Sequence, residues 1–509
     1  MRQSFTLTLA FMLLAIGLQA QHHYCGTTGE DLRLLEQRLM DNKRALQEGL
    51  IVNRNETRYV PVKFHLIGET NGEGRVRINR VLNQLCALNE DFEPHGIQFY
   101  IKDGLNYIYN DQAFNNHISV ENSILSQNRD QNAMNIFIPK DANVGSGSGG
   151  VVLGYYNIPR DWVVIGKPEM GASSITVPHE VGHFFSLLHP FNGWEGQAWD
   201  PDLHGNPVTQ TLAPDGFTRV EVVDGSNCDF AADRLCDTPP NYGFGLGWPD
   251  CDFTEEVQDR NGDVLDPDEK LFMDYFFGCS RTEYYFSEDQ VNAMHADYDH
   301  PSRAYIRSSY IPNQDEITAE PQLNSPEQGA TLTVFDQVTF NWDAVDGATA
   351  YNIQVAQEPS FTSPVYDEVV TGTSVNVTNL EPTRLHFWRV RPFNEYYTCT
   401  NFSDFQVFTT GTLSGTTDPG FAQTFEASPN PIKPGQPIQL RIVLEHSAEA
   451  QFNLYTAAGQ RVQRLGTRQL RTGENRFQLP LSGLKSGACL LERANEQQHR
   501  QFIRLMVVN

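Results

Sequence analysis

The sequence is poor in positive charge. Its 509 residues include 37 Lys and Arg against 63 Asp and Glu, which gives a formal net charge of −26. A surface this acidic repels the phosphate backbone of nucleic acids and the anionic surface of membranes. The imbalance is largest over residues 200–275, which contain 18 acidic and 4 basic side chains. We therefore expect a protein that does not bind nucleic acid.

Long hydrophobic runs are also missing. The apolar run Leu7–Leu18 has 12 residues, whereas a helix that spans a bilayer needs about 20. Arg2 before this run and Ala20 after it are typical of a secretory signal peptide, so residues 1–20 are predicted to direct export. A membrane anchor is the alternative interpretation. No later segment is long and apolar enough to predict a transmembrane helix.

Cysteines with the CxxC spacing of zinc sites are absent, although the chain has 8 cysteines. Four of them, Cys228, Cys236, Cys251 and Cys279, lie in the acidic region. An exported protein enters an oxidising environment, so these four predict two disulfides, among three possible pairings. A zinc site made of the four thiolates is the alternative, and it lacks the usual paired spacing.

The order of the predicted elements indicates several domains, since a domain usually has about 100–200 residues. After the signal peptide, residues 21–57 contain one polar helix, and we interpret them as a pro-segment. Strands and helices then alternate to about residue 310, which predicts a mixed α/β layer. Residues 321–411 show short strands of period two, as in a β-sandwich, and residues 418–509 form a second short β domain.

One short segment carries the chemistry of the chain. His179 and His183 are four residues apart, so on a helix both imidazoles lie on one face and can bind one metal ion. Glu180 is then placed to act as general base. Catalytic zinc takes three protein ligands and keeps one position open, and His189 is the candidate third ligand. The alternative is that these are ordinary core residues on a buried helix. It requires that three histidines and a glutamate all find hydrogen-bond partners in the core by accident.

His189 can reach the same metal only if the helix ends soon after His183. On a continuing helix it would lie about 9 Å further along the axis. We therefore predict a sharp turn after His183.

Residues downstream of the histidines complete a resemblance. Met273 and Tyr275 follow the HExxHxxxxxH motif, and residues 227–240 contain two of the clustered cysteines before an Asp-Thr-Pro-Pro sequence. Together these segments resemble the pappalysin/cytophagalysin branch of the metzincin zinc peptidases, over residues 58–300. The resemblance implies an α+β catalytic domain with a mixed twisted sheet and a zinc-binding helix. It also implies that Met273 lies beneath the zinc and that Tyr275 donates a hydrogen bond to the oxyanion.

Two further metal-binding roles follow from the resemblance alone. Cys25, in a Cys-Gly-Thr triplet, resembles the pro-segment cysteine that caps zinc in latent family members, so the enzyme is expected to be made as a zymogen. A surface thiol or a disulfide is the alternative for Cys25. Asp237 and Thr238 occupy the place where related enzymes bind structural Ca²⁺. In these families glycine holds the position in the turn after the second histidine that Ser186 holds here. Serine enters the left-handed conformation of such a turn at a cost of about 1–2 kcal/mol.

The C-terminal half carries two more resemblances. Trp342, residues 347–351 and residues 387–390 resemble fibronectin type III modules, and this implies the fold of the β-sandwich over 321–411. Residues 418–509 are similar to the C-terminal sorting domain of type IX secretion. That similarity implies outer-membrane secretion machinery as a partner, and export through the periplasm of a Gram-negative bacterium to the cell surface or beyond. A second generic sandwich is the alternative.

The predicted function is a secreted zinc-dependent endopeptidase that hydrolyses peptide bonds of proteins. Zinc would lower the pKa of a bound water and Glu180 would take the proton of that water. An extended substrate is expected to pair with an edge strand, for which Val151–Tyr156 is the candidate. The alternatives are a catalytically silent secreted binding protein on the same scaffold, and a zinc enzyme that acts on a non-peptide bond.

Overall fold

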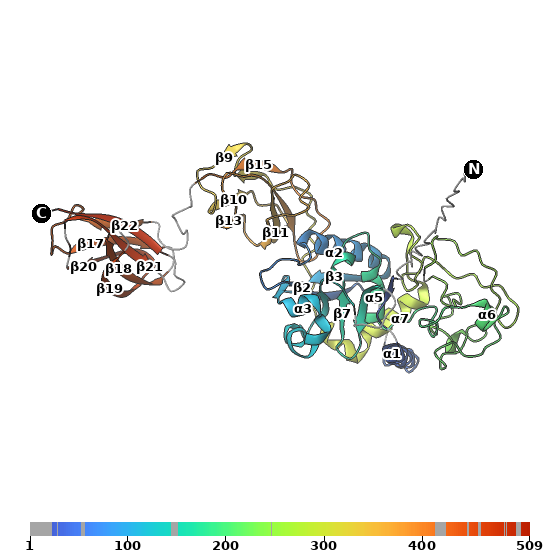
Figure 1. Ribbon diagram of the computed structural model, residues 1–509. Helices are drawn as coiled ribbons and strands as arrows, with labels where there is room; N and C mark the ends of the chain where they lie inside the picture. The colour runs from blue at the N-terminus through green and yellow to red at the C-terminus, as the bar shows by residue number, and fades with distance from the viewer. Residues whose placement is uncertain are drawn as a thin grey trace, which may run out of the picture.

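The computed structural model (Figure 1) describes residues 23–508 except 28, 52–55, 144–150, 246, 413–423, 445–446, 457–459, 483, 485 and 495–499. The predicted signal peptide lies outside these residues. None of the helices in the described part has both the length and the hydropathy that crossing a bilayer requires.

A seven-stranded mixed sheet forms the centre of the N-terminal half. Every strand pair in it is parallel except β6 with β7, which is antiparallel. The strands, in sheet order, are β1 (His23–Cys25), β6 (Val151–Asn157), β7 (Trp162–Ile165), β5 (Met134–Ile138), β2 (Arg58–Gly68) and β3 (Ile97–Ile101), and β4 (Asn106–Tyr109) also pairs with β2. Five of these strands overlap segments that the sequence predicts as strands, namely residues 59–68, 97–101, 133–139, 151–156 and 162–165.

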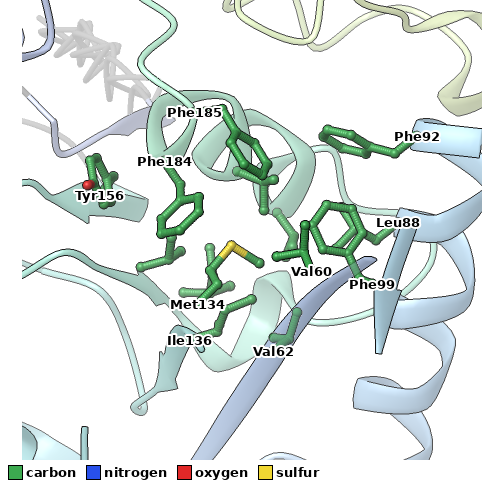
Figure 2. Close-up of a cluster of buried hydrophobic side chains, with 14 of the residues drawn as sticks. Val60, Val62, Leu88, Phe92, Phe99, Met134, Ile136, Tyr156, Phe184 and Phe185 are labelled. Atoms are coloured by element: carbon green, nitrogen blue, oxygen red, sulfur yellow. The ribbon is translucent and has the colours of Figure 1, made fainter. Parts of the chain in front are cut away.

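Two helices pack their apolar faces on this sheet, α2 (Ile78–Phe92) and α5 (Thr176–Phe184). Figure 2 shows Leu88 and Phe92 of α2 and Phe184 of α5 meeting Val60 and Met134 from the strands. The apolar periodicity of residues 75–92 predicts a helix, and α2 begins three residues later, at Ile78. Arg77, just before α2, has an extended backbone, and Arg75 forms an ion pair with Glu368 at 2.8 Å.

The predicted pro-segment is part of the same core. Its helix α1 (Glu30–Gln47) buries Leu32, Leu35 and Leu39 and contacts α7 (Glu288–Asp299). Strand β1 pairs with β6 and so covers the side of β6 that β7 leaves open. The predicted edge strand is therefore an interior strand while the pro-segment is in place.

The acidic region between α5 and α7 has little regular structure apart from α6 (Pro201–His204) and short 3₁₀ turns. A separate cluster of buried aromatic side chains and two disulfides stabilise it. The predicted pair of disulfides is confirmed, and the pairing is Cys228–Cys236 and Cys251–Cys279.

The C-terminal half consists of two β-sandwiches, which agrees with the predicted multidomain architecture. The first packs a three-stranded sheet against a five-stranded sheet around Trp342 and Trp388. The second packs a three-stranded sheet, β16-β17-β20, against a four-stranded one, β19-β18-β21-β22. The strands of the first are β8 (Leu323–Ser325), β9 (Ala330–Thr331), β10 (Val338–Trp342), β11 (Ala350–Ala356), β12 (Tyr366–Val370), β13 (Ser374–Val377), β14 (Leu385–Phe393) and β15 (Gln406–Thr409). Those of the second are β16 (Thr424–Ser428), β17 (Ile438–Leu444), β18 (Ala448–Thr456), β19 (Arg461–Leu470), β20 (Gly473–Leu479), β21 (Gly487–Ala494) and β22 (Arg500–Val507).

A third disulfide joins the first sandwich to the N-terminal half. Cys86 of α2 is bonded to Cys399, which is 313 residues away in the sequence. Near this bond, Arg391 of β14 donates a hydrogen bond to Asn83 of α2 at 2.6 Å. The sandwich is therefore attached covalently as well as by polar contacts, and the sequence did not reveal this.

Candidate metal centre

The predicted turn after the second histidine is present. Helix α5 ends at Phe184, and Ser186 adopts a left-handed φ of +71°. The amide of Ser186 donates to the carbonyl of His183 at 2.9 Å, and the amide of Leu187 donates to the carbonyl of Gly182 at 3.0 Å. This pair of hydrogen bonds is the Schellman motif that ends helices, with serine at the position where glycine is usual.

Because the chain turns here, three imidazoles converge. The Nε2 atom of His189 lies 3.0 Å from Nε2 of His183 and 3.2 Å from Nε2 of His179. Ligands at zinc–nitrogen distances of about 2.0–2.1 Å in a tetrahedron are separated by about 3.3 Å. The spacing of the three nitrogens therefore fits a single zinc ion.

The other nitrogen of each ring has an acceptor. Nδ1 of His179 lies 2.7 Å from the carbonyl oxygen of Phe272, and Nδ1 of His183 lies 2.8 Å from the carbonyl oxygen of Leu187. Nδ1 of His189 lies 3.1 Å from Oε1 of Glu195. Acceptors on Nδ1 place the proton there and leave Nε2 for a metal, as is usual for metal-binding histidines. Glu195 was missed from sequence, where no spacing rule distinguishes it.

Burial keeps these imidazoles neutral. It lowers the pKa of His179 and the pKa of His189 to about 3, and it lowers the pKa of His183 well below its ordinary value. The neighbouring His189 lowers the pKa values of the other two further. Metal binding requires neutral histidine, so these three rings are prepared as ligands.

Glu180 lies beside the histidines with a free carboxylate. Its side chain is fully buried, and neither oxygen accepts a hydrogen bond of ordinary geometry from the described residues. Burial raises the pKa of Glu180 to about 8. Buried polar atoms are almost always satisfied, so this exception indicates a group that is held for a ligand or for a reaction.

Met273 lies directly under the metal-binding helix, and its side chain is fully buried. Gly182, between the two helical histidines, leaves the space that the sulfur occupies, because a Cβ at this position would overlap Met273 Sδ. Two residues later, the ring of Tyr275 has its centroid 5.0 Å from that of His189 and 5.8 Å from that of His179. The structure thus brings Met273 and Tyr275 to the histidine cluster.

This contact predicts the effect of Gly182→Ala. The added methyl group displaces Met273 in a packed core, and overpacking of this kind costs about 1–3 kcal/mol. Denaturant unfolding should show a lower midpoint for Gly182→Ala, whereas Gly196→Ala, where a Cβ would meet nothing within 4 Å, should leave it unchanged. Equal midpoints for the two variants would contradict the close packing of Met273.

Cys25 lies on the fourth side of the histidine cluster. Its sulfur and the ligating nitrogens of the three histidines all lie within 4.8 Å of one another. The amide of Cys25 donates to the hydroxyl oxygen of Tyr275 at 3.0 Å, which fixes the backbone at this point. Burial and the nearby Glu180 carboxylate raise the pKa of the Cys25 thiol. The structure describes Cys25 as a buried free cysteine.

Two adjoining cavities open at the cluster. The first, of about 20 Å³, is lined by Cys25, His179, Glu180 and Tyr275 and has room for about one water molecule. The second, of about 180 Å³, extends away from the histidines beside Ser174 and Tyr284. Four residues line both cavities, which are therefore neighbours; they are Leu153, Ile175, Thr176 and Phe277.

The chain has homologues among extracellular metalloproteases. An extracellular metalloprotease of Neurospora crassa is 26% identical to it over 244 residues, which are 42% of this chain and 80% of that protein. One of Colletotrichum graminicola is 29% identical over 159 residues, 26% of this chain and about half, 52%, of that protein. No protein-family model matches the chain.

Solved structures align only weakly. The fibronectin(III)-like modules of Clostridium thermocellum CbhA cover 37% of this chain with 6% identity and a TM-score of 0.15. The FN1–FN3 domains of chicken CNTN1 cover 38% with 13% identity and a TM-score of 0.17. These scores are too low to assign a fold.

The two predicted calcium ligands use their oxygens within the protein. Asp237 accepts hydrogen bonds from Ser287 Oγ at 2.7 Å and from the amide of Asp289 at 2.8 Å. Thr238 Oγ1 donates to Asp233, which is fully buried. Neither residue belongs to a group of His, Cys, Asp or Glu ligands that the described residues bring together. Calcium binding stays a prediction.

Proposed function

We propose that the protein is a secreted zinc endopeptidase of the pappalysin-like metzincin type. The observation that carries the proposal is the convergence of three Nε2 atoms beside the free, buried carboxylate of Glu180. The homology to extracellular metalloproteases supports the same reaction class. His179, His183 and His189 would hold the zinc.

When bound, zinc polarises the scissile carbonyl and makes water acidic enough to lose a proton near neutral pH. Glu180 would accept that proton and transfer it to the leaving amine, because its buried side chain lies beside the three histidines. Tyr275, beside the histidines, would donate a hydrogen bond to the oxyanion. Removing one such donor from an enzyme typically raises the activation free energy by about 2.7–4 kcal/mol. The cavity beside Ser174 accepts a substrate side chain.

The described pro-segment is proposed to keep the enzyme latent. Cys25 would occupy the open zinc position, and β1 would block the edge of β6 where an extended substrate pairs. The remaining space, about 20 Å³, is far too small for a peptide. Release of residues 21–57 is therefore expected to be required for activity.

The remaining parts of the chain are proposed to serve secretion and attachment. We infer a catalytic domain over 58–310, a fibronectin type III-like sandwich over 321–411, and a type IX sorting domain over 418–509 that engages outer-membrane secretion machinery. Export would then pass through the periplasm of a Gram-negative bacterium. The two separate sandwich cores support the division of this half into two β domains.

The test is to measure zinc content and casein hydrolysis on one sample, with and without chelator, after the pro-segment has been released. One zinc per chain and chelator-sensitive cleavage would support the proposal. Zinc without cleavage of casein or gelatin would indicate a silent scaffold or a non-peptide substrate instead, and absence of zinc would refute the metal centre.

Replacing the third ligand tests the convergence directly. His189→Ala leaves two helical histidines, so zinc content after dialysis against a weak chelator should drop from one per chain to near zero. His300→Ala is a matched control, since this histidine lies after α7 and its ring contacts Ser302 rather than the cluster. Full zinc occupancy in His189→Ala would show that His189 is not a ligand.

A further inference from the structure

Ser186 holds a backbone conformation that serine normally avoids. Its φ of +71° lies in the left-handed region, where the Cβ of an L-residue is crowded by the backbone. The side chain is also fully buried, so its hydroxyl needs a partner inside the protein. Something beyond the two backbone hydrogen bonds of the turn must therefore favour this conformation.

That partner is Asp297 on α7. Ser186 Oγ donates to Asp297 Oδ1, across 111 residues of sequence. The Asp297 side chain is itself fully buried. Hydrogen bonds to a charged acceptor are about twice as strong as those between neutral groups. The hydroxyl thus connects the turn to α7.

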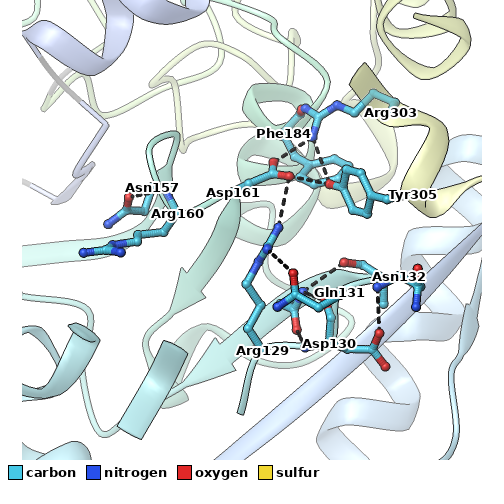
Figure 3. Close-up of polar contacts among 12 residues, drawn as sticks. Arg129, Asp130, Gln131, Asn132, Asn157, Arg160, Asp161, Phe184, Arg303 and Tyr305 are labelled. Carbon is cyan, nitrogen blue, oxygen red and sulfur yellow. Dashed lines mark hydrogen bonds and ion pairs between the residues drawn. The ribbon is translucent and has the colours of Figure 1, made fainter. Parts of the chain in front are cut away.

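Arg303 completes the contact. Its Nε donates to Asp297 Oδ2 at 2.6 Å, and its Nη2 donates to the carbonyl oxygen of Phe184, the last residue of α5. The guanidinium carbon lies 4.1 Å from the centroid of the Phe184 ring, and Figure 3 shows the two side chains together. One ion pair therefore holds both the end of α5 and the left-handed residue that follows it.

The ion pair is fixed by a buried network. Arg303 Nη1 donates to Asp161 Oδ1 at 2.7 Å and to the hydroxyl of Tyr305 at 3.1 Å, as Figure 3 shows. Asp161 also accepts from the hydroxyl of Tyr156 at 2.6 Å. A buried charge is tolerated when it is paired and hydrogen-bonded in this way. Asp297 is consequently held in one orientation toward Ser186.

The pro-segment contributes to the same network. Asn42 of α1 donates to Asp297 Oδ1 at 3.0 Å, and this is the oxygen that accepts from Ser186. Arg38 of α1 donates to the hydroxyl of Tyr156 at 3.0 Å. In the latent chain, α1 therefore contributes directly to holding the turn that carries His189.

We propose that Asp297 is a positioning residue for the metal centre. It holds Ser186 in the left-handed turn and thereby places His189, while Arg303 fixes Asp297; this rests on the proposed zinc site. A glycine at position 186 would need no such hydrogen bond, because glycine adopts positive φ freely. In this chain a side-chain hydrogen bond replaces the conformational freedom of glycine.

The test compares zinc affinity among full-length variants, by competition with a chromophoric chelator. Ser186→Ala keeps the Cβ and loses the hydroxyl, so zinc should bind about 5- to 30-fold more weakly. Ser186→Gly loses both and should bind within about twofold of the original chain. In Asp297→Asn only one side-chain oxygen remains to accept from Ser186, Asn42 and Arg303. This substitution should therefore weaken zinc binding in the original chain, but should change it little when it is combined with Ser186→Gly.

The order of affinities decides the outcome. If the original chain and Ser186→Gly both bind zinc more tightly than Ser186→Ala, the positioning role is supported. A hydroxyl that only fills space would instead give the highest zinc affinity with serine, a lower one with alanine and the lowest with glycine. Equal affinities in all variants would overturn the role of Asp297 while leaving the zinc site intact. If the original chain binds no zinc, the proposed function fails instead. Should Asp297→Asn not fold, the alanine and glycine variants at position 186 decide alone.

Discussion

Glu180→Gln should abolish hydrolysis and leave zinc in place. Glutamine keeps the size of the side chain but cannot accept a proton, and loss of general acid–base catalysis lowers the rate by about 10²–10⁴-fold. The three histidines make their Nδ1 contacts without Glu180, so the metal centre should remain assembled. Casein turnover and zinc content are measured on the same processed sample.

The variant also removes a fully buried carboxyl group, whose oxygens make no hydrogen bond of ordinary geometry with the described residues. Because burial raises the pKa of Glu180 to about 8, the folded protein should not become less stable when glutamine replaces it. Glu121→Gln is a control, since Glu121 is half-buried and contacts Tyr155 and Asn157 rather than the histidines. Ordinary turnover in Glu180→Gln would remove Glu180 from the mechanism.

Cys25→Ser should make the unprocessed chain active. Serine is a poor zinc ligand, so the variant loses the contact that holds β1 over the cluster, and a contact worth only about 1.4 kcal/mol already shifts the equilibrium tenfold. We expect at least about a tenfold rise in casein turnover by the full-length chain, which processing then raises little further. Turnover is followed in the presence of inhibitors of other protease classes.

Cys489→Ser is the matched control for this experiment. Cys489 is also a buried, free cysteine, but it lies in β21 of the second sandwich, where it contacts Leu505. Its replacement should leave the precursor as latent as before. A Cys25→Ser precursor that stayed equally latent would mean that β1 and α1 block the site without help from the thiol.

Local patterns were sufficient for much of the fold and for the ligands. The spacing of His179 and His183 requires only the geometry of one helix, and the alternating residues 59–68 predict the central strand of the sheet. The need for a turn after His183 followed from the rise of a helix, because His189 could not otherwise return. These inferences involve neighbours along the chain, where sequence distance and spatial distance agree.

Glu195 lies only six residues after His189, but its loop shows no recognisable pattern that assigns it to this ring. Contacts between distant segments were invisible in the sequence. Asp297 reaches Ser186 from a helix 111 residues later. The same reason hid the bond between Cys86 and Cys399, since the two cysteines belong to different domains. Only the packing of the sheet, the helices and the sandwich brings these groups together.

The bond between Cys86 and Cys399 has a consequence for the way the chain would respond to proteolytic cleavage. The segment joining the N-terminal half to the first sandwich contains exposed residues such as Tyr310 and Ile311, where another enzyme, or a second copy of this one, can cut. Such a cut would not release the sandwich, because the disulfide still connects the two fragments. The cleaved protein would then remain a covalently linked, two-chain molecule until the disulfide is reduced.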